Sequence, residues 1–200
     1  MFSEYLYLGT WLLGGLLLKD KKEYRFLLTF LLLQGGLRVF AIGLSYLGNN
    51  LFIYQLIGLV ELIGAFFIYR NRVSDKWKNI IFLTTIFYLV SSVFIVSIWS
   101  LNSIGLAMVQ LAIIGLGINY LWNLYRSKSL KLLNKVPFFW INTAFILYAS
   151  GSFFFHLMSA KVNMETNDSL FNNAWILEAG FGILRLLIIC YTFIFIIREK

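Results

Sequence analysis

The sequence predicts an all-α integral membrane protein: a single seven-transmembrane-helix bundle that occupies residues 1–200. Of its 200 residues, 60% are hydrophobic and only 13% are charged, whereas soluble domains usually carry about 25% charged residues. The apolar residues gather in seven runs, most of them long enough to span a bilayer. The runs are 3–18, 26–47, 51–69, 80–100, 103–125, 136–159 and 171–197. They leave no room for a separate soluble domain.

The first run has to be distinguished from a signal peptide. Its start carries Glu4 in place of a positively charged segment, and the charged residues 19–22 follow where small residues would mark a cleavage site. We therefore expect residues 3–18 to form a membrane helix.

Basic residues alternate between the connections, and this alternation predicts the orientation. The connections after runs one, three and five and the C-terminal tail hold 14 of the 17 Lys and Arg residues. The connections after runs two and four hold none, and the one after run six holds only Lys161. Lys and Arg accumulate on the cytoplasmic side, so we expect the N-terminus outside and the C-terminus in the cytoplasm. The net charge of +8 thus reflects topology and anionic lipid rather than nucleic acid.

Aromatic residues near the ends of the runs are interpreted as interfacial belts, in which an amphipathic ring sits at the level of the lipid headgroups. They are Tyr5, Tyr7, Trp11, Trp77, Trp99, Tyr120, Trp122, Tyr125 and Trp140.

Two ions lie in the second and third runs at matching distances from the tight turn between them. Arg38 is eleven residues before Asn49, and Glu61 is twelve residues after it. At about 1.5 Å rise per residue, both lie about 17 Å from the turn, near the middle of a hydrocarbon layer about 30 Å thick. An unpaired charge there costs at least about 2.5–3.5 kcal/mol. We therefore expect Arg38 and Glu61 to face each other or a shared polar cavity.

Further polar residues inside the runs extend this interior. Glu178 and Arg185 share one face of the last run but lie about 10.5 Å apart along its axis, so each needs partners on other helices. Two guanidiniums and two carboxylates suit a pocket for a small anionic or zwitterionic ligand. Interhelical contacts that only fix the packing are the alternative. The candidate residues are Arg38, Glu61, Gln34, Gln55, Gln110, His156, Glu178 and Arg185.

The residues that carry common enzyme chemistry are scarce, so we predict a non-enzymatic protein with no cofactor and no metal. One histidine and one cysteine cannot build an ordinary zinc or transition-metal site. All the aspartates fall in connections, which excludes a Ser-His-Asp triad inside the runs. A membrane hydrolase that uses Glu61 or Glu178 is the enzymatic alternative.

Two stretches carry a family resemblance. In the third run, Tyr54 is followed seven residues later by Glu61; in the sixth, residues 137–142 (PFFWIN) precede residues 147–154 (LYASGSFF), and residues 175–177 (WIL) open the seventh. These stretches resemble a seven-helix membrane module of Bacteroidota that occurs alone or fused to sensor histidine kinases. The resemblance implies a signal-input role in the bacterial cytoplasmic (inner) membrane. Its motif positions are Tyr54, Glu61, Trp140, Asn142 and Tyr148.

Three functions are compatible with these observations. The first is a sensor-like module that, with no kinase after Lys200 in this sequence, needs a separate cytoplasmic signalling partner. The second is a small-solute transporter of three-plus-one-plus-three layout, for which residues 60–64 (VELIG) and 177–180 (LEAG) form a faint internal repeat. The third is a structural subunit of a membrane complex. The expected partners are the lipid bilayer, the small ligand and a second copy in a homo-oligomer.

Overall fold

The computed structural model is an all-helical bundle. It describes residues 2–18, 21–46, 48, 50–95, 101–127, 133, 135–161 and 168–198. The helices are α1 (Phe2–Leu18), α2 (Arg25–Ser45), α3 (Leu51–Tyr69), α4 (Asp75–Val90), α5 (Ser103–Arg126), α6 (Pro137–Lys161) and α7 (Asp168–Arg198). A 3-10 turn, η1 (Lys22–Tyr24), leads into α2, and a π turn, η2 (Ser91–Ile95), follows α4. The helix predicted for 80–100 thus begins earlier, and its last five residues lie outside the described part of the chain.

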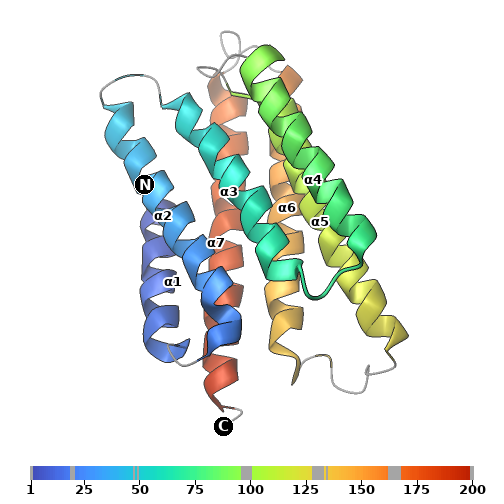
Figure 1. Cartoon of the computed structure of the whole chain (residues 1–200). Helices are drawn as coiled ribbons and strands as arrows, with labels where there is room; N and C mark the ends of the chain where they lie inside the picture. The colour runs from blue at the N-terminus through green and yellow to red at the C-terminus, as the bar shows by residue number, and fades with distance from the viewer. Residues whose placement is uncertain are drawn as a thin grey trace.

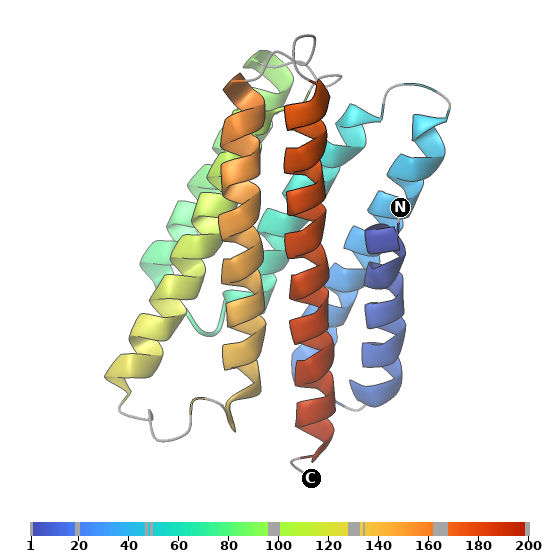
Figure 2. The same cartoon turned by 180° about the vertical axis from the view of Figure 1, so that it is seen from behind.

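Six of the seven helices are long and apolar enough to cross a membrane. Large apolar side chains on their outward faces, such as Phe82 (66% exposed) and Leu187 (60% exposed), suit contact with lipid. The chain is therefore an integral membrane protein. The exception is α1, whose 17 residues span about 26 Å; it begins partway along the bundle in Figures 1 and 2.

Six helices form a closed ring, and α4 lies outside it. Around the ring, α1 packs on α2, α2 on α3, α3 on α5, α5 on α6, α6 on α7, and α7 returns to α1. The seventh helix, α4, contacts only α3 and α5 among its major neighbours and buries just Ile81 and Tyr88 between Asp75 and Val90. The protein interior is therefore built by two groups of three helices, α1–α3 and α5–α7.

The two ends of the bundle differ in charge. Helices α1, α3, α5 and α7 all end at the lower side of Figure 1, where α2, α4 and α6 begin. We call this the basic end. Its described cations are Lys21, Lys22, Arg25, Arg70, Arg72, Lys76, Lys78, Arg126, Lys135 and Arg198. At the opposite end, Lys161 is the one described Lys or Arg within the last turn of a helix.

The turn between α4 and α5 is tied together by Asn102. Its Oδ1 accepts a hydrogen bond from the Gly105 backbone N–H at 2.9 Å, which caps α5. Its Nδ2 donates to the hydroxyls of Ser91 at 2.8 Å and Ser92 at 3.0 Å. A single buried side chain thus joins the π turn to the start of α5.

Several tyrosines predicted as belt residues belong to the interior. Tyr7 is 1% exposed and Tyr120 is 7% exposed, so the prediction is wrong for both. Trp122 and Tyr125 do lie on the outside, at 51% and 60% exposure, and Trp99 falls outside the described residues. A lipid-embedded helix is apolar on nearly every face, so the sequence gives little information on which aromatic turns inward.

Helices α6 and α7 approach closely at Gly151, and this contact gives a testable prediction. A Cβ at Gly151 would lie 2.2 Å from the Phe181 ring, whereas a Cβ at Gly180 on the facing helix would meet nothing within 4 Å. We expect Gly151→Ala to lower the free energy of unfolding by about 1–3 kcal/mol through overpacking. Gly180→Ala is the matched control and should be neutral or slightly stabilising. Unfolding in mixed micelles measures both, and equal effects would contradict the close packing.

Candidate functional site

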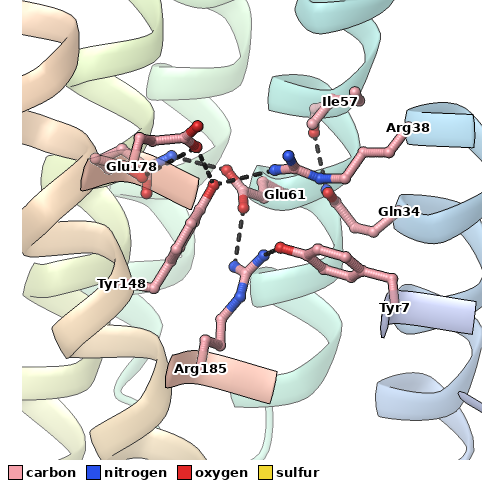
Figure 3. A network of polar contacts seen from close by, with 10 residues as sticks. Tyr7, Gln34, Arg38, Ile57, Glu61, Tyr148, Glu178 and Arg185 are labelled. Atoms are coloured by element: carbon pink, nitrogen blue, oxygen red, sulfur yellow. Dashed lines mark hydrogen bonds and ion pairs between the residues drawn. The ribbon is translucent and has the colours of Figure 1, made fainter. Parts of the chain in front are cut away.

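A cluster of polar and charged side chains lies in the middle of the helix ring (Figure 3). We call this cluster the polar centre. Each ring helix contributes at least one member, and α4 contributes none. The members are Tyr7 (α1), Gln34 and Arg38 (α2), Glu61 (α3), Gln110 (α5), Tyr148 (α6), and Glu178 and Arg185 (α7).

The strongest contact of the polar centre is a buried ion pair between α3 and α7. Arg185 Nη1 lies 2.9 Å from Glu61 Oε1, with the two side chains 0% and 2% exposed. The other carboxylate oxygen of Glu61 accepts a hydrogen bond from Gln110 Nε2 at 2.7 Å. Arg185 Nη2 donates to the Tyr7 hydroxyl, and its guanidinium carbon sits 3.5 Å from the centre of the Tyr148 ring. Five helices therefore converge on one salt bridge.

Arg38 is not the partner of Glu61. Among the described residues, the ion pairs within 4.0 Å are Arg185–Glu61 and Lys78–Asp75. The expected direct contact between Arg38 and Glu61 is therefore wrong, although both residues line one small cavity of about 20 Å³. The physical reason is rotation: counting residues from the turn fixes the depth of a side chain but not the face of the helix on which it lies. In the structure, α7 brings Arg185 to the carboxylate instead.

Arg38 is linked to the other charged residues of the polar centre through the hydroxyl of Tyr148. Its Nη2 donates to the Tyr148 hydroxyl at 3.2 Å, and that hydroxyl donates to Glu178 Oε1 at 3.0 Å. Ser152 Oγ lies 3.5 Å from the same carboxylate oxygen. Tyr148 thus links the second cation to the second carboxylate, and the polar centre holds two positive and two negative side chains.

Two small cavities lie beside Arg38. Each has a volume of about 20 Å³, and Arg38, Tyr148, Trp175 and Glu178 line both. Such a volume accommodates about one water molecule. Tyr54, Glu61 and His156 also line the first cavity, and Tyr7 also lines the second.

Several buried polar atoms in and near the polar centre have no hydrogen-bond partner in the structure. Among the described residues they include Arg38 Nε, Arg185 Nε, Gln34 Oε1, Gln110 Oε1 and His156 Nδ1. Buried polar atoms in native proteins are nearly always paired with protein or ordered water. Of these residues, Arg38 and His156 line the cavities, so their unused nitrogen atoms lie where a polar ligand or water would sit.

The other predicted residues lie beside the polar centre or towards one of the two ends of the bundle. Gln34 shares the Arg38 face of α2, as expected, and its Nε2 donates to the Ile57 carbonyl at 3.0 Å. Gln55 is buried, its carbonyl accepts from the Tyr88 hydroxyl at 2.8 Å, and it lines neither cavity. Asn142 accepts a hydrogen bond from the Tyr69 hydroxyl at 2.7 Å, and Trp140 packs on Tyr191.

Three residues of this region were not among the candidates from the sequence. Tyr7 was interpreted as a belt residue, and Ser152 and Trp175 were only parts of longer motifs. Tyr5, two positions before Tyr7, is 54% exposed, so two tyrosines on opposite faces of α1 carry the same sequence signal. Nothing in a single sequence separates them.

Among the described residues, no group of three or more His, Cys, Asp or Glu side chains is placed to hold a metal ion. No family model, curated protein or solved structure matches this chain. The resemblance to the Bacteroidota module therefore stays a prediction. The polar centre is the feature of the structure that bears on the function.

Proposed function

We propose that this protein is a non-enzymatic signal-input module that binds a small anionic or zwitterionic solute at the polar centre. The main observation behind this proposal is that most N–H groups of Arg38 are unused. A guanidinium has five N–H donors, and Arg38 uses one of them, on a neutral phenol. A ligand carboxylate would accept two N–H groups of Arg38 at once, and an amino group on the same ligand would be attracted to the Glu178 carboxylate.

Binding at this place would require the helices to move. The cavities beside Arg38 have volumes of about 20 Å³, far below the 300–1,000 Å³ typical of ligand pockets. A solute would have to separate α2, α6 and α7 and favour a second packing of the ring. Trp175 and Glu178 line the cavities and α7 continues to Arg198 at the basic end, so a shift of α7 would be transmitted along the whole bundle.

We also propose an orientation of the protein in the membrane. The described cations gather at the basic end, and Lys and Arg remain on the cytoplasmic side of membrane proteins. The basic end would face the cytoplasm of a bacterium across its inner membrane, and α7 would deliver its shift to a cytoplasmic signalling partner. Reporter fusions after Arg126 and after Lys161 test this orientation, because the two positions should lie on opposite sides of the membrane.

Ligand-dependent stability is the direct test. We expect one member of a panel of carboxylates and amino acids to raise the melting temperature of the detergent-purified protein; saturation at 100 times Kd corresponds to about 2.7 kcal/mol. Arg38→Gln should abolish the shift, since it removes the charge that faces the cavities.

Arg126→Gln removes an exposed arginine at the end of α5 and is the matched control, which should keep the full response. A melting-temperature shift that survives Arg38→Gln unchanged would contradict a binding site at the polar centre.

A small-solute transporter is the second candidate, and the arrangement of the helices favours it. The contacts α1–α2 and α2–α3 are repeated by α5–α6 and α6–α7, and the contact α3–α5 has its counterpart in α7–α1. Glu61 and Glu178 are each the eleventh residue of their helices, α3 and α7. Such an internal repeat, with α4 outside the ring, is the three-plus-one-plus-three layout of some transporters.

Transport and sensing differ in one measurement. The purified protein is reconstituted into liposomes, and the radiolabelled solute that shifts the melting temperature is added outside. Uptake of the label above that of protein-free liposomes supports transport, whatever the net charge of the solute. A melting-temperature shift without uptake supports the signal-input module.

A further inference from the structure

A second and larger hollow lies at the basic end, far along the bundle from the polar centre. This cleft has a volume of about 600 Å³ and is bounded by η1 and the start of α2, the end of α3 and the start of α6. Figure 1 shows the start of α2 and the end of α3 side by side at the lower side of the bundle. Lys22, Arg70 and Arg72 line the cleft, together with one acidic residue, Glu23.

The two arginines of the cleft rest on aromatic rings. The Arg70 guanidinium lies 4.6 Å from the centre of the Phe26 ring and 5.7 Å from that of Phe67, and the Arg72 guanidinium lies 3.8 Å from that of Phe138. Within the described part of the chain, neither arginine is in an ion pair with a carboxylate. A guanidinium held by its face keeps its N–H edge available for an oxyanion.

An apolar groove begins where the cleft ends. It has a volume of about 350 Å³ and runs along the outer surface between α2 and α3, over Thr29, Leu33, Ile63 and Gly64. Phe26 and Phe67 line both the cleft and the groove. Their rings are stacked at 5.3 Å, and Arg70 lies on this pair, at the boundary between the charged and the apolar part.

We infer that the cleft and the groove together form a binding site for an anionic phospholipid. The phosphate would lie among Lys22, Arg70 and Arg72, and one acyl chain would follow the groove between α2 and α3. A free phosphate ion would explain the cations but would leave the adjoining apolar groove without an occupant. The groove lies on a surface that faces lipid, and anionic headgroups are attracted to basic residues at the membrane boundary. The site shares no lining residue with the two cavities of the polar centre.

Native mass spectrometry of the detergent-purified protein tests the headgroup. The probes are dioleoylphosphatidylglycerol, dioleoylphosphatidylcholine, which has the same chains, and inorganic phosphate. We expect one phosphatidylglycerol to remain bound under conditions that remove phosphatidylcholine, and millimolar phosphate not to displace it. Equal retention of the two lipids, or displacement by phosphate at that concentration, would overturn the proposal.

Paired variants test the residues. Arg70→Gln with Arg72→Gln should weaken phosphatidylglycerol binding about 30-fold, the factor expected for two basic residues at a membrane surface. Lys76→Gln with Arg126→Gln removes the same charge from exposed positions of the basic end that do not line the cleft and should leave binding unchanged. Equal weakening by the two pairs would indicate only general attraction to the basic end and would overturn the site.

A third variant keeps the cations of the cleft and blocks the groove proposed for the acyl chain. Thr29 is exposed in the groove, so Thr29→Trp fills it without entering the core and should weaken phosphatidylglycerol binding at least tenfold. Leu111→Trp places the same side chain on the exposed face of α5, outside the groove, and is the control. Binding that is unaffected by Thr29→Trp would overturn the assignment of the groove to an acyl chain, whether or not the arginine pair folds.

Discussion

Replacing Arg185 with methionine is expected to destabilise the protein by about 3–5 kcal/mol, the cost of leaving a buried charge without its partner. Arg185 is fully buried and holds Glu61 Oε1 at 2.9 Å. After the change, Glu61 keeps only the hydrogen bond from Gln110, which cannot compensate its charge. Methionine fills similar space with apolar atoms, so the loss reports the charge rather than a cavity.

A double variant measures the interaction free energy between Arg185 and Glu61 apart from the separate contributions of the two side chains. Arg185→Met combined with Glu61→Gln removes both charges and keeps an acceptor for Gln110, so most of the lost free energy should return. Unfolding by titration with a denaturing detergent in mixed micelles measures the cycle. Arg198→Met, an exposed change at the end of the same helix, is the control. If the double variant is as unstable as the sum of the two singles, the pair does not act as a unit.

Tyr148→Phe is expected to cost about 3 kcal/mol and to change the response to ligand. The hydroxyl accepts from Arg38 and donates to Glu178, and hydrogen bonds to charged groups contribute about 1.5–3 kcal/mol each. Without the hydroxyl, Ser152 at 3.5 Å is the one hydrogen-bond partner that Glu178 retains among the described residues, and Arg38 loses its hydrogen bond to α6. We therefore expect the ligand-dependent shift in melting temperature to decrease together with stability.

Tyr69→Phe is the control for this second experiment. Tyr69 is equally buried, but its hydroxyl donates to Asn142, a neutral acceptor, so its removal should cost about 1 kcal/mol and leave the ligand response intact. The same loss for both tyrosines would show that Tyr148 contributes packing rather than a link between charges.

The helices and their approximate bounds could be predicted from the sequence, because a membrane span needs a long apolar run and the connections are marked by charge. The six longer helices confirm those runs by length and composition. The first run also forms a helix, but at 17 residues it is shorter than the six candidate membrane spans, which have 19 to 24 residues. The peripheral place of α4 could not be predicted from its composition, because the mean hydropathy of its span, 1.4, equals that of α6, which belongs to the ring.

The membership of the polar centre was predicted better than its pairing. Arg38, Glu61, Gln34, Gln110, Glu178 and Arg185 do come together, because ionic and amide groups inside a membrane protein are driven to share one interior. Which arginine meets Glu61 depends on the rotation of each helix, and a helix that is apolar on all sides gives no period from which to determine it. The aromatic members were missed for a related reason: the same tyrosine suits a headgroup layer or a buried cation.

The outlying position of α4 has a geometric consequence for the rest of the chain. Because one helix separates the two groups of three helices, α5 begins at the same side of the membrane as α1, and the helices of the two groups run in the same directions. With no helix between them, the second group would be upside down, and the carboxylates of α3 and α7 would enter from opposite leaflets. A helix that buries few side chains therefore sets the direction in which α7 crosses the membrane, so that Glu61 and Glu178 each lie eleventh in a helix that runs towards the basic end.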